Sequence, residues 1–139
     1  MDKILFLFYL KKFKDISIKL GFSIPLNVFG SGLSIPHYGT IIVNANARIG
    51  KNCRLHVGVN IGASGGTDLA PNLGNNLYLG PGSILFGDIF IADNVTIAAN
   101  ATVNKSFDTK NITIGGTPAI IIKKNTNVWW EKNRLVLKN

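Results

Sequence analysis

The feature that most constrains the fold is a six-residue spacing of aliphatic side chains between residues 79 and 103. An α-helix returns a side chain to the same face after three or four residues, and a β-strand does so after two. Neither element alone produces a spacing of six, so we interpret the segment as an internal repeat. The period covers most of residues 29–120, at Phe29, Ile35, Val43, Ile49, Leu55, Ile61, Leu73, Leu79, Leu85, Ile91, Ile97, Val103, Ile114 and Ile120.

A second set of small or apolar residues recurs four positions after many of these aliphatic residues. Its members are Ala47, Cys53, Val59, Ser83, Ile89, Val95 and Ala101. The remaining positions are rich in Gly, Asn, Asp and Pro, which tolerate turn conformations. We therefore predict that each unit is a short strand followed by a corner, and that three units close one triangular coil of about 18 residues. The alternative, a β-sandwich, gives no reason for a constant spacing of six. The predicted fold is an all-β solenoid, a parallel β-helix preceded by a short helix.

Two interruptions of the period are candidate functional segments. Eight residues instead of six separate Ile35 from Val43, and the surplus falls in PHYG at 36–39. The segment GASGGTDLAPN follows Ile61, and it is either one degenerate unit centred on Thr67 or an extruded loop. We expect the loop because of its Gly-Gly and Pro. Insertions in a solenoid project from one edge and commonly form the site.

The size and charge of the chain limit its organisation and its partners. We divide its 139 residues into a helical lead-in at 1–21, a β-helix domain at 22–124 and a tail at 125–139. The net charge of +8 favours anionic partners. Nucleic-acid binding is not expected, because no aromatic stacking platform or recognition helix accompanies the charge. Because Cys53 is the single cysteine, the chain cannot form an intrachain disulfide, and we predict a cytoplasmic location. We expect Cys53 itself to be a small buried side chain.

The lead-in is predicted to be an amphipathic helix that ends at Gly21. Its apolar run at 4–10 is too short for a membrane-spanning helix, which needs roughly 20 residues, and no cleavage site follows it. The helix either caps the open end of the solenoid or packs on a neighbouring subunit, and the alternative is peripheral contact with the inner membrane surface. In the tail, Trp129 and Trp130 are expected to cover the other end of the solenoid or an interface.

Two segments add a family resemblance to the repeat. They are GLSIPHYGTIIVNANARIGKNCRLHVGVNIG at 32–62 and IGGTPAIIIKK at 114–124. With the repeat, they resemble the serine acetyltransferase-like branch of the left-handed β-helix acyltransferases, and most closely the sugar or capsular-polysaccharide O-acetyltransferases. The resemblance covers about residues 20–124. It implies a left-handed coil, a homotrimer with active sites between subunits, acetyl-CoA as the donor and no metal.

The two histidines, His37 and His56, are the candidate catalytic residues. His37 matches the catalytic histidine of the family, which implies that it is the general base for the acceptor hydroxyl. A neutral imidazole suits this task near pH 7. Counting coils places Ile35 and Leu55 at equivalent corners one coil apart, so the two histidines should share one cleft or one intersubunit groove. For His56 we predict acceptor binding, oxyanion stabilisation or a reserve base.

The group that orients His37 is not evident, because no Asp or Glu occurs between Asp15 and Asp68. A backbone carbonyl, the side chain of Ser34 or Asn44, or an acid brought in by folding or by another subunit must take this role.

The loop carries a departure from the family. Serine acetyltransferases have a histidine in a GGDRHP-like stretch, whereas this chain has GGTDLAP, with Ala70 at the matching place. This difference argues against L-serine as the acceptor and for a sugar hydroxyl.

For the donor, the resemblance implies a groove along late coils in which the pantetheine contacts backbone groups. Its residues would be Gly80, Ala98, Gly116, Thr117 and Pro118. Lys123 and Lys124 are candidate partners for the nucleotide phosphates, or alternatively a solvated basic pair. The expected function is acetyl-CoA-dependent O-acetylation of a saccharide in surface polysaccharide biosynthesis, by direct acyl transfer. The alternatives are serine O-acetylation for cysteine synthesis and a noncatalytic hexapeptide-repeat scaffold.

Overall fold

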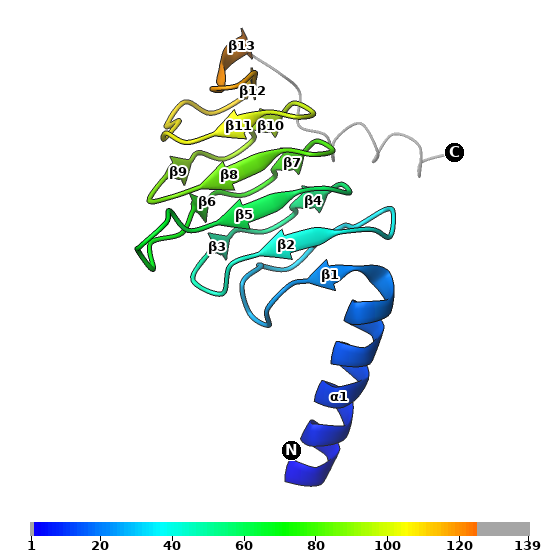
Figure 1. The fold of residues 1–139 in the computed structure, drawn as a ribbon. Coiled ribbons are helices and arrows are strands. Elements are labelled where there is room, and N and C mark those ends of the chain that lie inside the picture. Colours follow the sequence, from blue (N-terminus) through cyan, green and yellow to red (C-terminus); the bar gives the residue numbers. More distant parts are fainter. Residues whose placement is uncertain (1, 125–139) are drawn as a thin grey trace, which may run out of the picture.

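The computed structural model describes residues 2–124, so the predictions for Trp129 and Trp130 lie outside the described residues. Within this range one helix precedes thirteen short strands (Figure 1). The elements are α1 (Lys3–Leu20), β1 (Phe22–Ser23), β2 (Ile41–Val43), β3 (Arg48–Ile49), β4 (Arg54–Leu55), β5 (Asn60–Gly62), β6 (Asn72–Leu73), β7 (Tyr78–Leu79), β8 (Ile84–Phe86), β9 (Phe90–Ile91), β10 (Thr96–Ile97), β11 (Thr102–Val103), β12 (Ile112–Gly115) and β13 (Ile120–Lys124).

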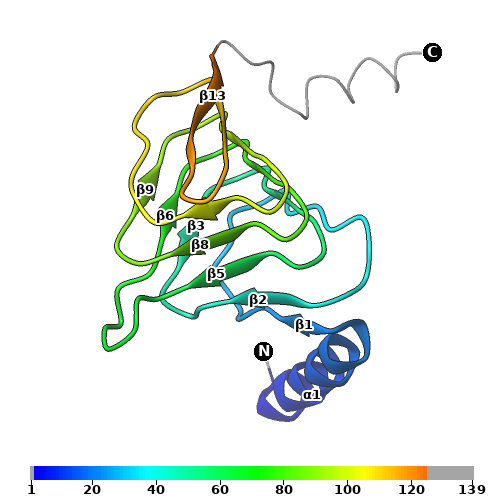
Figure 2. The ribbon, with the colours of Figure 1, turned by 45° about the horizontal axis from the view of Figure 1, so that its top comes forward.

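The strands form the three walls of a left-handed parallel β-helix (Figure 1, Figure 2). The first wall has the order β1-β2-β5-β8-β11, the second has the order β3-β6-β9, and the third has the order β13-β12-β10-β7-β4. Tyr78 pairs with Thr96 and Ile84 pairs with Thr102, so the paired residues lie 18 positions apart. These registers confirm the predicted coil of three six-residue units.

The core is a single column of the residues that the period predicted to point inward. From Val43 to Ile114, every aliphatic position of the period is at most 5% exposed, as are the seven residues of the second set. Burial of each large aliphatic side chain contributes roughly 1.5–3 kcal/mol. Phe29 and Ile35 are only partly buried and pack against the end of this column.

The inward prediction is wrong for Ile120, whose side chain is 56% exposed. The chain reverses after β12, through a turn that includes Gly116 at a φ of 96°. As a result β13 pairs antiparallel with β12 instead of starting another coil. Without a further coil, the inward position that the period assigned to Ile120 does not exist.

An asparagine ladder, which we did not predict, holds the corner before the third wall. Asn52, Asn76, Asn94 and Asn111 have φ angles of 56–61°, in the left-handed region that Asn tolerates better than most residues. The Nδ2 of Asn52 donates to Oδ1 of Asn76 at 2.9 Å, Asn76 donates to Asn94 at 2.8 Å, and Asn94 donates to Asn111 at 3.0 Å. One residue type therefore satisfies the turn geometry and links four coils.

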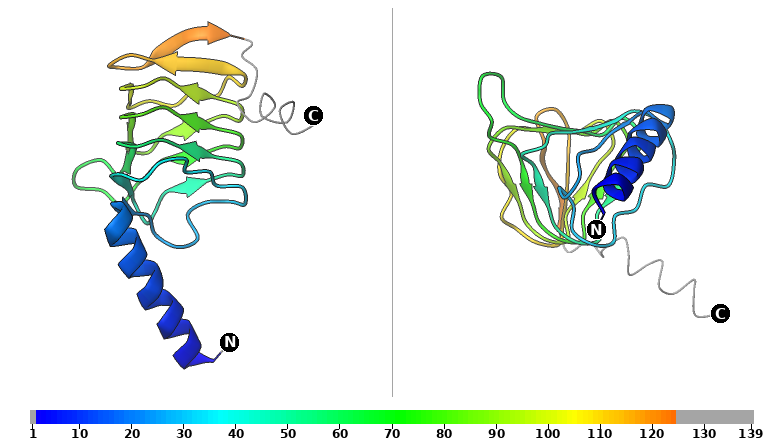
Figure 3. Two further views of the ribbon diagram at one scale, coloured as in Figure 1. Left: turned by 90° about the vertical axis from the view of Figure 1, so that its right-hand side faces the viewer. Right: turned by 90° about the horizontal axis from the view of Figure 1, so that it is seen from below.

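The segment between Ile61 and Leu73 is an extruded loop and not a degenerate unit. Residues 63–71 belong to no strand, and residues 65–69 are exposed. A Cβ added at Gly65 or Gly66 would meet no heavy atom within 4 Å, so the loop stands away from the wall (Figure 3). The chain resumes the period at Leu73, one coil below Ile91 in the register of β6 and β9.

Helix α1 has no buried residue and projects away from the first coil (Figure 1, Figure 3). It ends as predicted at Gly21, whose φ of 80° is left-handed and whose N–H bonds back to the carbonyls of Ser17 and Ile18. The helix does not cap the open end of the core, which corrects one of our alternatives. Within the described residues, no helix has the length and apolar character required to cross a membrane.

Candidate active site

His37 and His56 meet at the corner between the third wall and the first wall. Ser34 forms a parallel bridge with Arg54, so the segment before His37 lies one coil below β4, and His56 directly follows β4. The ring centroids are 6.2 Å apart and the ring planes differ by 43°. The side chains therefore come together within one protomer, as the coil count predicted.

The turn that carries His37 is fixed by backbone contacts on both sides. The N–H of Gly39 donates to the carbonyl of Leu20 at 2.9 Å, which ties the turn to the end of α1. Gly39 has a φ of 134°, and a Cβ there would lie 2.5 Å from Cγ2 of Val57. The two-residue surplus thus forms a turn that needs glycine and leaves His37 exposed beside His56.

His56 lies in a partly buried setting made by two side chains that sequence reasoning missed. Its ring contacts that of Tyr78 with a centroid distance of 4.9 Å, and Nε of Arg54 donates to its Nε2 at 3.4 Å. Burial lowers the pKa of His56 below its ordinary value, and the charges of Arg54 and His37 lower it further. The lowered pKa favours the neutral form of His56, and the hydrogen bond from Arg54 requires Nε2 as the acceptor, which leaves the ring proton on Nδ1.

The orienting group of His37 is not found among residues 2–124. Neither Ser34 nor Asn44 bonds to the His37 ring, and Oδ1 of Asn44 instead accepts from the backbone N–H of Asn46 at 2.8 Å. The two residues named as side-chain partners therefore do not take this role within the described chain, and an acid from another subunit remains a prediction.

A column of small residues rises from His56 along the same corner. The inward Leu55, Leu79, Ile97 and Ile114 are paired in register, so the residues that follow them also stack on successive coils. These residues are His56, Gly80, Ala98 and Gly115. Gly80 is buried, and a Cβ there would lie 2.7 Å from the backbone nitrogen of Ala99. The positions directly above His56 are therefore small, and the side chain of Ile122 lies over Gly115 at the upper end of the column.

The predicted donor turn at 116–118 docks on this corner. Oγ1 of Thr117 donates to Oγ1 of Thr102 at 3.1 Å, and the N–H of Thr102 donates to the carbonyl of Gly116 at 2.9 Å. Gly116 follows Gly115 at the top of the column. The structure thus brings Gly80, Ala98 and the turn to the histidine corner.

The predicted phosphate partners lie elsewhere on the third wall. Lys123 pairs with Thr113 and Lys124 pairs with Ile112, at the opposite end of β12 from the turn. The three strand steps from Ile112 to Gly115 amount to about 10 Å. Both lysines are exposed, so they can reach only a ligand that extends along the top of the wall.

The sequence contained a signal for Arg54 and Tyr78. Each directly precedes an inward leucine, Leu55 or Leu79, and the two are register partners on β4 and β7. Arg54 lies two residues before His56 along the same coil, and the coil count would then have placed Tyr78 beside both.

Cys53 is 1% exposed, and burial raises the pKa of its thiol to about 12. The prediction that it is a buried hydrophobe and not a nucleophile is confirmed, because the thiolate is not accessible at neutral pH. Among the described residues, no group of three or more His, Cys, Asp or Glu is arranged to hold a metal ion.

Two cavities lie away from the histidines. One of about 470 Å³ separates α1 from residues 22–26, and one of about 340 Å³ lies against β3 and β6. Neither includes His37 or His56.

Comparison with known proteins agrees with this geometry. The chain is 31% identical over 96 residues to the serine acetyltransferase of Helicobacter pylori, and the match covers 68% of this chain and 56% of that protein. It is 32% identical over 97 residues to the serine acetyltransferase of Staphylococcus epidermidis, with coverage of 68% and 45%. No family model matches the chain.

Solved structures have the same fold. A Brucella abortus serine acetyltransferase in complex with Coenzyme A superposes with a TM-score of 0.67 and 32% identity, over 72% of this chain and 40% of that one. A Neisseria gonorrhoeae serine acetyltransferase gives a TM-score of 0.65 and 28% identity, over 71% of this chain and 39% of that one. The chain spans about half the length of the relatives it matches. It shares the hexapeptide repeat and the left-handed β-helix with the serine acetyltransferases.

Proposed function

We propose that this hexapeptide-repeat protein is an O-acetyltransferase that moves an acetyl group from acetyl-CoA to a hydroxyl group. The observation that carries the proposal is the pair of histidines 6.2 Å apart, at the foot of a corner lined by small residues. The likeness to serine acetyltransferases, one of them solved in complex with Coenzyme A, supports the same reaction class.

The reaction needs one base and no covalent intermediate on the protein. The acceptor oxygen attacks the thioester carbon while a nitrogen of His37 takes the hydroxyl proton. The tetrahedral intermediate then releases the CoA sulfur as the C–S bond breaks, and the imidazolium returns the proton to that sulfur. Neutral His56 can donate from Nδ1 to the oxyanion or to the acceptor. Burial of Cys53 is consistent with direct transfer, because the chain has no other thiol to carry the acyl group.

The residues at the corner fit an extended donor. Gly80 and Ala98 leave room for a pantetheine chain to lie against the backbone, with its thioester end at His56 and the side chain of Ile122 over Gly115 at the upper end. The turn at 116–118 would flank the upper part of the chain. Lys123 and Lys124 would contact phosphates only if the nucleotide crosses the top of the third wall, since they stand about 10 Å from the turn.

For the acceptor we propose L-serine, because the relatives that match are serine acetyltransferases. This differs from the sugar that we favoured from the sequence. Arg54 lies beside His56 and supplies a positive charge near the reacting corner, which suits the carboxylate of an amino acid.

A sugar hydroxyl is the second candidate, and the loop is the observation that favours it. The loop has Ala70 where serine acetyltransferases have a histidine, and Asp68 is its only ionisable residue. Ala70 packs partly against the core and presents no polar group to an amino acid. A saccharide in polysaccharide assembly needs no cationic partner from this loop.

We also propose that the active unit is a homotrimer. Ile42 and Ile84 point outward from the first wall and are 43% and 41% exposed in the single chain. They lie in the same register column, so a neighbouring subunit could cover both. A trimer mass in light scattering would support this assembly, and a monomer with full activity would contradict it.

The acceptor can be identified by incubating the protein with acetyl-CoA and either L-serine or a panel of sugars, and by measuring the free CoA thiol that is released. Buried Cys53 should give little background with a thiol reagent. Turnover with serine supports the first candidate, and turnover with a saccharide alone supports the second. Absence of CoA release with every acceptor would favour the noncatalytic scaffold.

The role of His37 as the general base is tested by His37→Ala, which should lower turnover by roughly 10²- to 10⁴-fold. Added imidazole should restore part of the rate, because it can enter the exposed space that the side chain leaves. Lys51→Ala, at an exposed corner of the solenoid, is the matched control and should leave turnover unchanged. Near-normal turnover of His37→Ala would exclude this residue as the base.

A further inference from the structure

The first two turns of α1 expose apolar side chains in every direction. Six consecutive residues are apolar and exposed, from 42% for Phe6 to 77% for Ile4. Successive helical residues are rotated by about 100°, so six of them cover the whole circumference. These residues, which we call the apolar collar, are Ile4, Leu5, Phe6, Leu7, Phe8 and Tyr9.

Lysines follow the apolar collar along the same helix. Lys11, Lys12 and Lys14 come within the next two turns, and α1 contains five lysines against the single acid Asp15. The whole chain carries a net charge of +8. A ring of lysines next to apolar side chains complements a surface that is anionic outside and apolar within.

The pattern of exposed side chains indicates that the apolar collar binds lipid and not a partner helix. A helix that packs along α1 would cover a stripe that repeats every three or four residues and would leave the other side of the collar in water. Lipid headgroups and acyl chains can surround the collar on all sides. At 1.5 Å per residue the collar is about 9 Å long, which matches the depth of the bilayer interface and not its full thickness.

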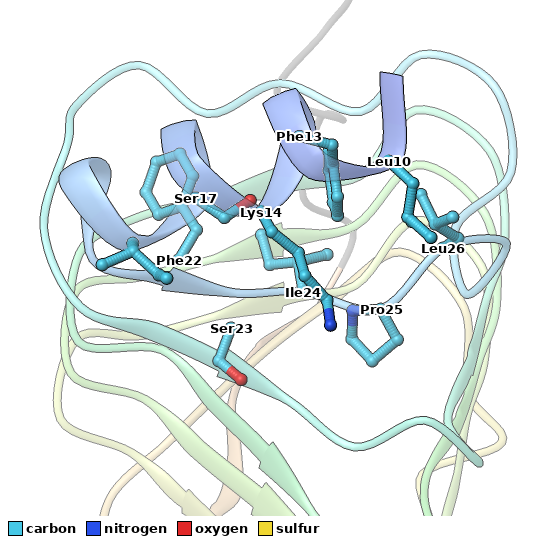
Figure 4. A pocket seen from close by; sticks show the side chains of 10 residues that line it. Leu10, Phe13, Lys14, Ser17, Phe22, Ser23, Ile24, Pro25 and Leu26 are labelled. Atoms are coloured by element: carbon cyan, nitrogen blue, oxygen red, sulfur yellow. The ribbon is translucent and has the colours of Figure 1, made fainter. Parts of the chain in front are cut away.

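The position of α1 leaves this surface accessible. The helix projects away from the first coil, and only its second half approaches the solenoid (Figure 3). There a groove of about 470 Å³ lies between the helix and residues 22–26, with Leu10 and Phe13 on one side and Phe22, Ile24 and Leu26 on the other (Figure 4). The groove extends the apolar surface from the helix to the base of the solenoid.

We propose that α1 docks the protein peripherally on an anionic lipid bilayer, with the apolar collar in the interface and the lysines against the headgroups. The turn that carries His37 is hydrogen-bonded to the end of this helix, because the N–H of Gly39 donates to the carbonyl of Leu20. Docking therefore holds the histidine corner near the bilayer surface. This consequence for catalysis rests on the proposed function, whereas docking itself does not depend on it.

The first test is co-sedimentation of the full chain with vesicles, at low and at physiological salt. Vesicles that contain phosphatidylglycerol should bind the protein at least tenfold more strongly than phosphatidylcholine vesicles, because the lysines add to the apolar contribution. The double variant Lys11→Glu/Lys12→Glu should lose at least tenfold in partitioning to the anionic vesicles. The matched control Lys51→Glu/Lys105→Glu makes the same charge change on the solenoid and should lose much less.

The apolar contribution is tested by Leu7→Gln/Phe8→Gln, which should also reduce binding at least tenfold. Both residues are exposed, so the solenoid should fold, and circular dichroism checks this. Equal binding of this variant and the parent protein would overturn insertion of the collar. Failure of the parent protein to bind anionic vesicles would overturn the whole proposal, whatever the acetyltransferase assay shows.

Insertion can be observed directly with one fluorophore. Because Cys53 is buried, a Leu7→Cys variant offers one reactive thiol for an environment-sensitive dye. Its emission should shift to shorter wavelength with anionic vesicles and be quenched by spin-labelled lipid, while dye on Lys51→Cys should not respond. Dissociation of a free oligomer on Leu7→Gln/Phe8→Gln substitution, seen by sedimentation velocity, would instead identify α1 as a subunit contact and refute lipid docking.

Discussion

The asparagine ladder predicts a specific order of stability for substitutions at Asn76. This residue accepts a side-chain hydrogen bond from Asn52 at 2.9 Å and donates one to Asn94 at 2.8 Å. Its φ of 59° is in the left-handed region. Asn76→Ala removes both bonds and leaves in that region a residue that tolerates it less well than Asn, whereas Asn76→Gly removes the bonds and relieves the backbone.

The magnitudes follow from these two contributions. Two partly buried hydrogen bonds contribute about 1–3 kcal/mol together. A left-handed residue with a Cβ costs roughly 1–2 kcal/mol, which Asn tolerates better than Ala. Because Asn76 already carries a Cβ, only the difference between Asn and Ala in this region is added, and Asn76→Ala should lower the free energy of unfolding by about 2–3 kcal/mol. Asn76→Gly avoids the steric cost but adds chain entropy to the unfolded state, about 0.5–1 kcal/mol, so it should be the milder change.

Urea unfolding followed by circular dichroism measures the difference. With a slope of roughly 1–3 kcal/mol per molar urea, Asn76→Ala should move the midpoint down by about 1–3 M. The control is Asn104→Ala, at an exposed position outside the ladder, which should stay within about 0.5 kcal/mol of the parent protein. A midpoint for Asn76→Ala equal to that of the control would show that the ladder does not stabilise the corners. A midpoint for Asn76→Gly below that of Asn76→Ala would refute the backbone argument.

Two further predictions concern the core and the site. Leu79→Ala leaves a cavity at a fully buried position and should destabilise the protein by about 2–5 kcal/mol in the same urea assay, whereas a loss below 1 kcal/mol would mean that the coils close around the gap. The pKa of His56 is lowered in the folded protein, so the unfolded chain binds more protons, and stability should fall as pH drops through the ordinary value of 6.5. Arg54→Gln should raise the pKa of His56 in an NMR titration, and an unchanged titration would remove Arg54 as a cause.

Much of the fold could be predicted because the repeat places one side chain of each unit inward. The residues from Val43 to Ile114 are buried at the spacing that the sequence showed, and the coil count alone brought His37 and His56 to one corner. Counting worked there because each coil stacks on the one below with a constant register. It failed at Ile120, where a reversal of the chain ended the register before the pattern of aliphatic residues ended.

The side chains that modify the site were harder to predict. Arg54 acts on His56 from two residues away on the same coil, and Tyr78 acts on it from the next coil, whereas the sequence shows only that both residues precede inward leucines. The separation of Lys123 and Lys124 from the donor turn likewise depends on the antiparallel pairing of β13.

The sequence by itself determined the period, the inward side chains and the turn residues, because these depend on local geometry that every unit repeats. Only the tertiary structure decided which units stack, which asparagines bond, where the last strand reverses and how far α1 stands from the core. These features arise from contacts between residues one coil or more apart. Their energies depend on register and approach distance, which the six-residue pattern does not contain.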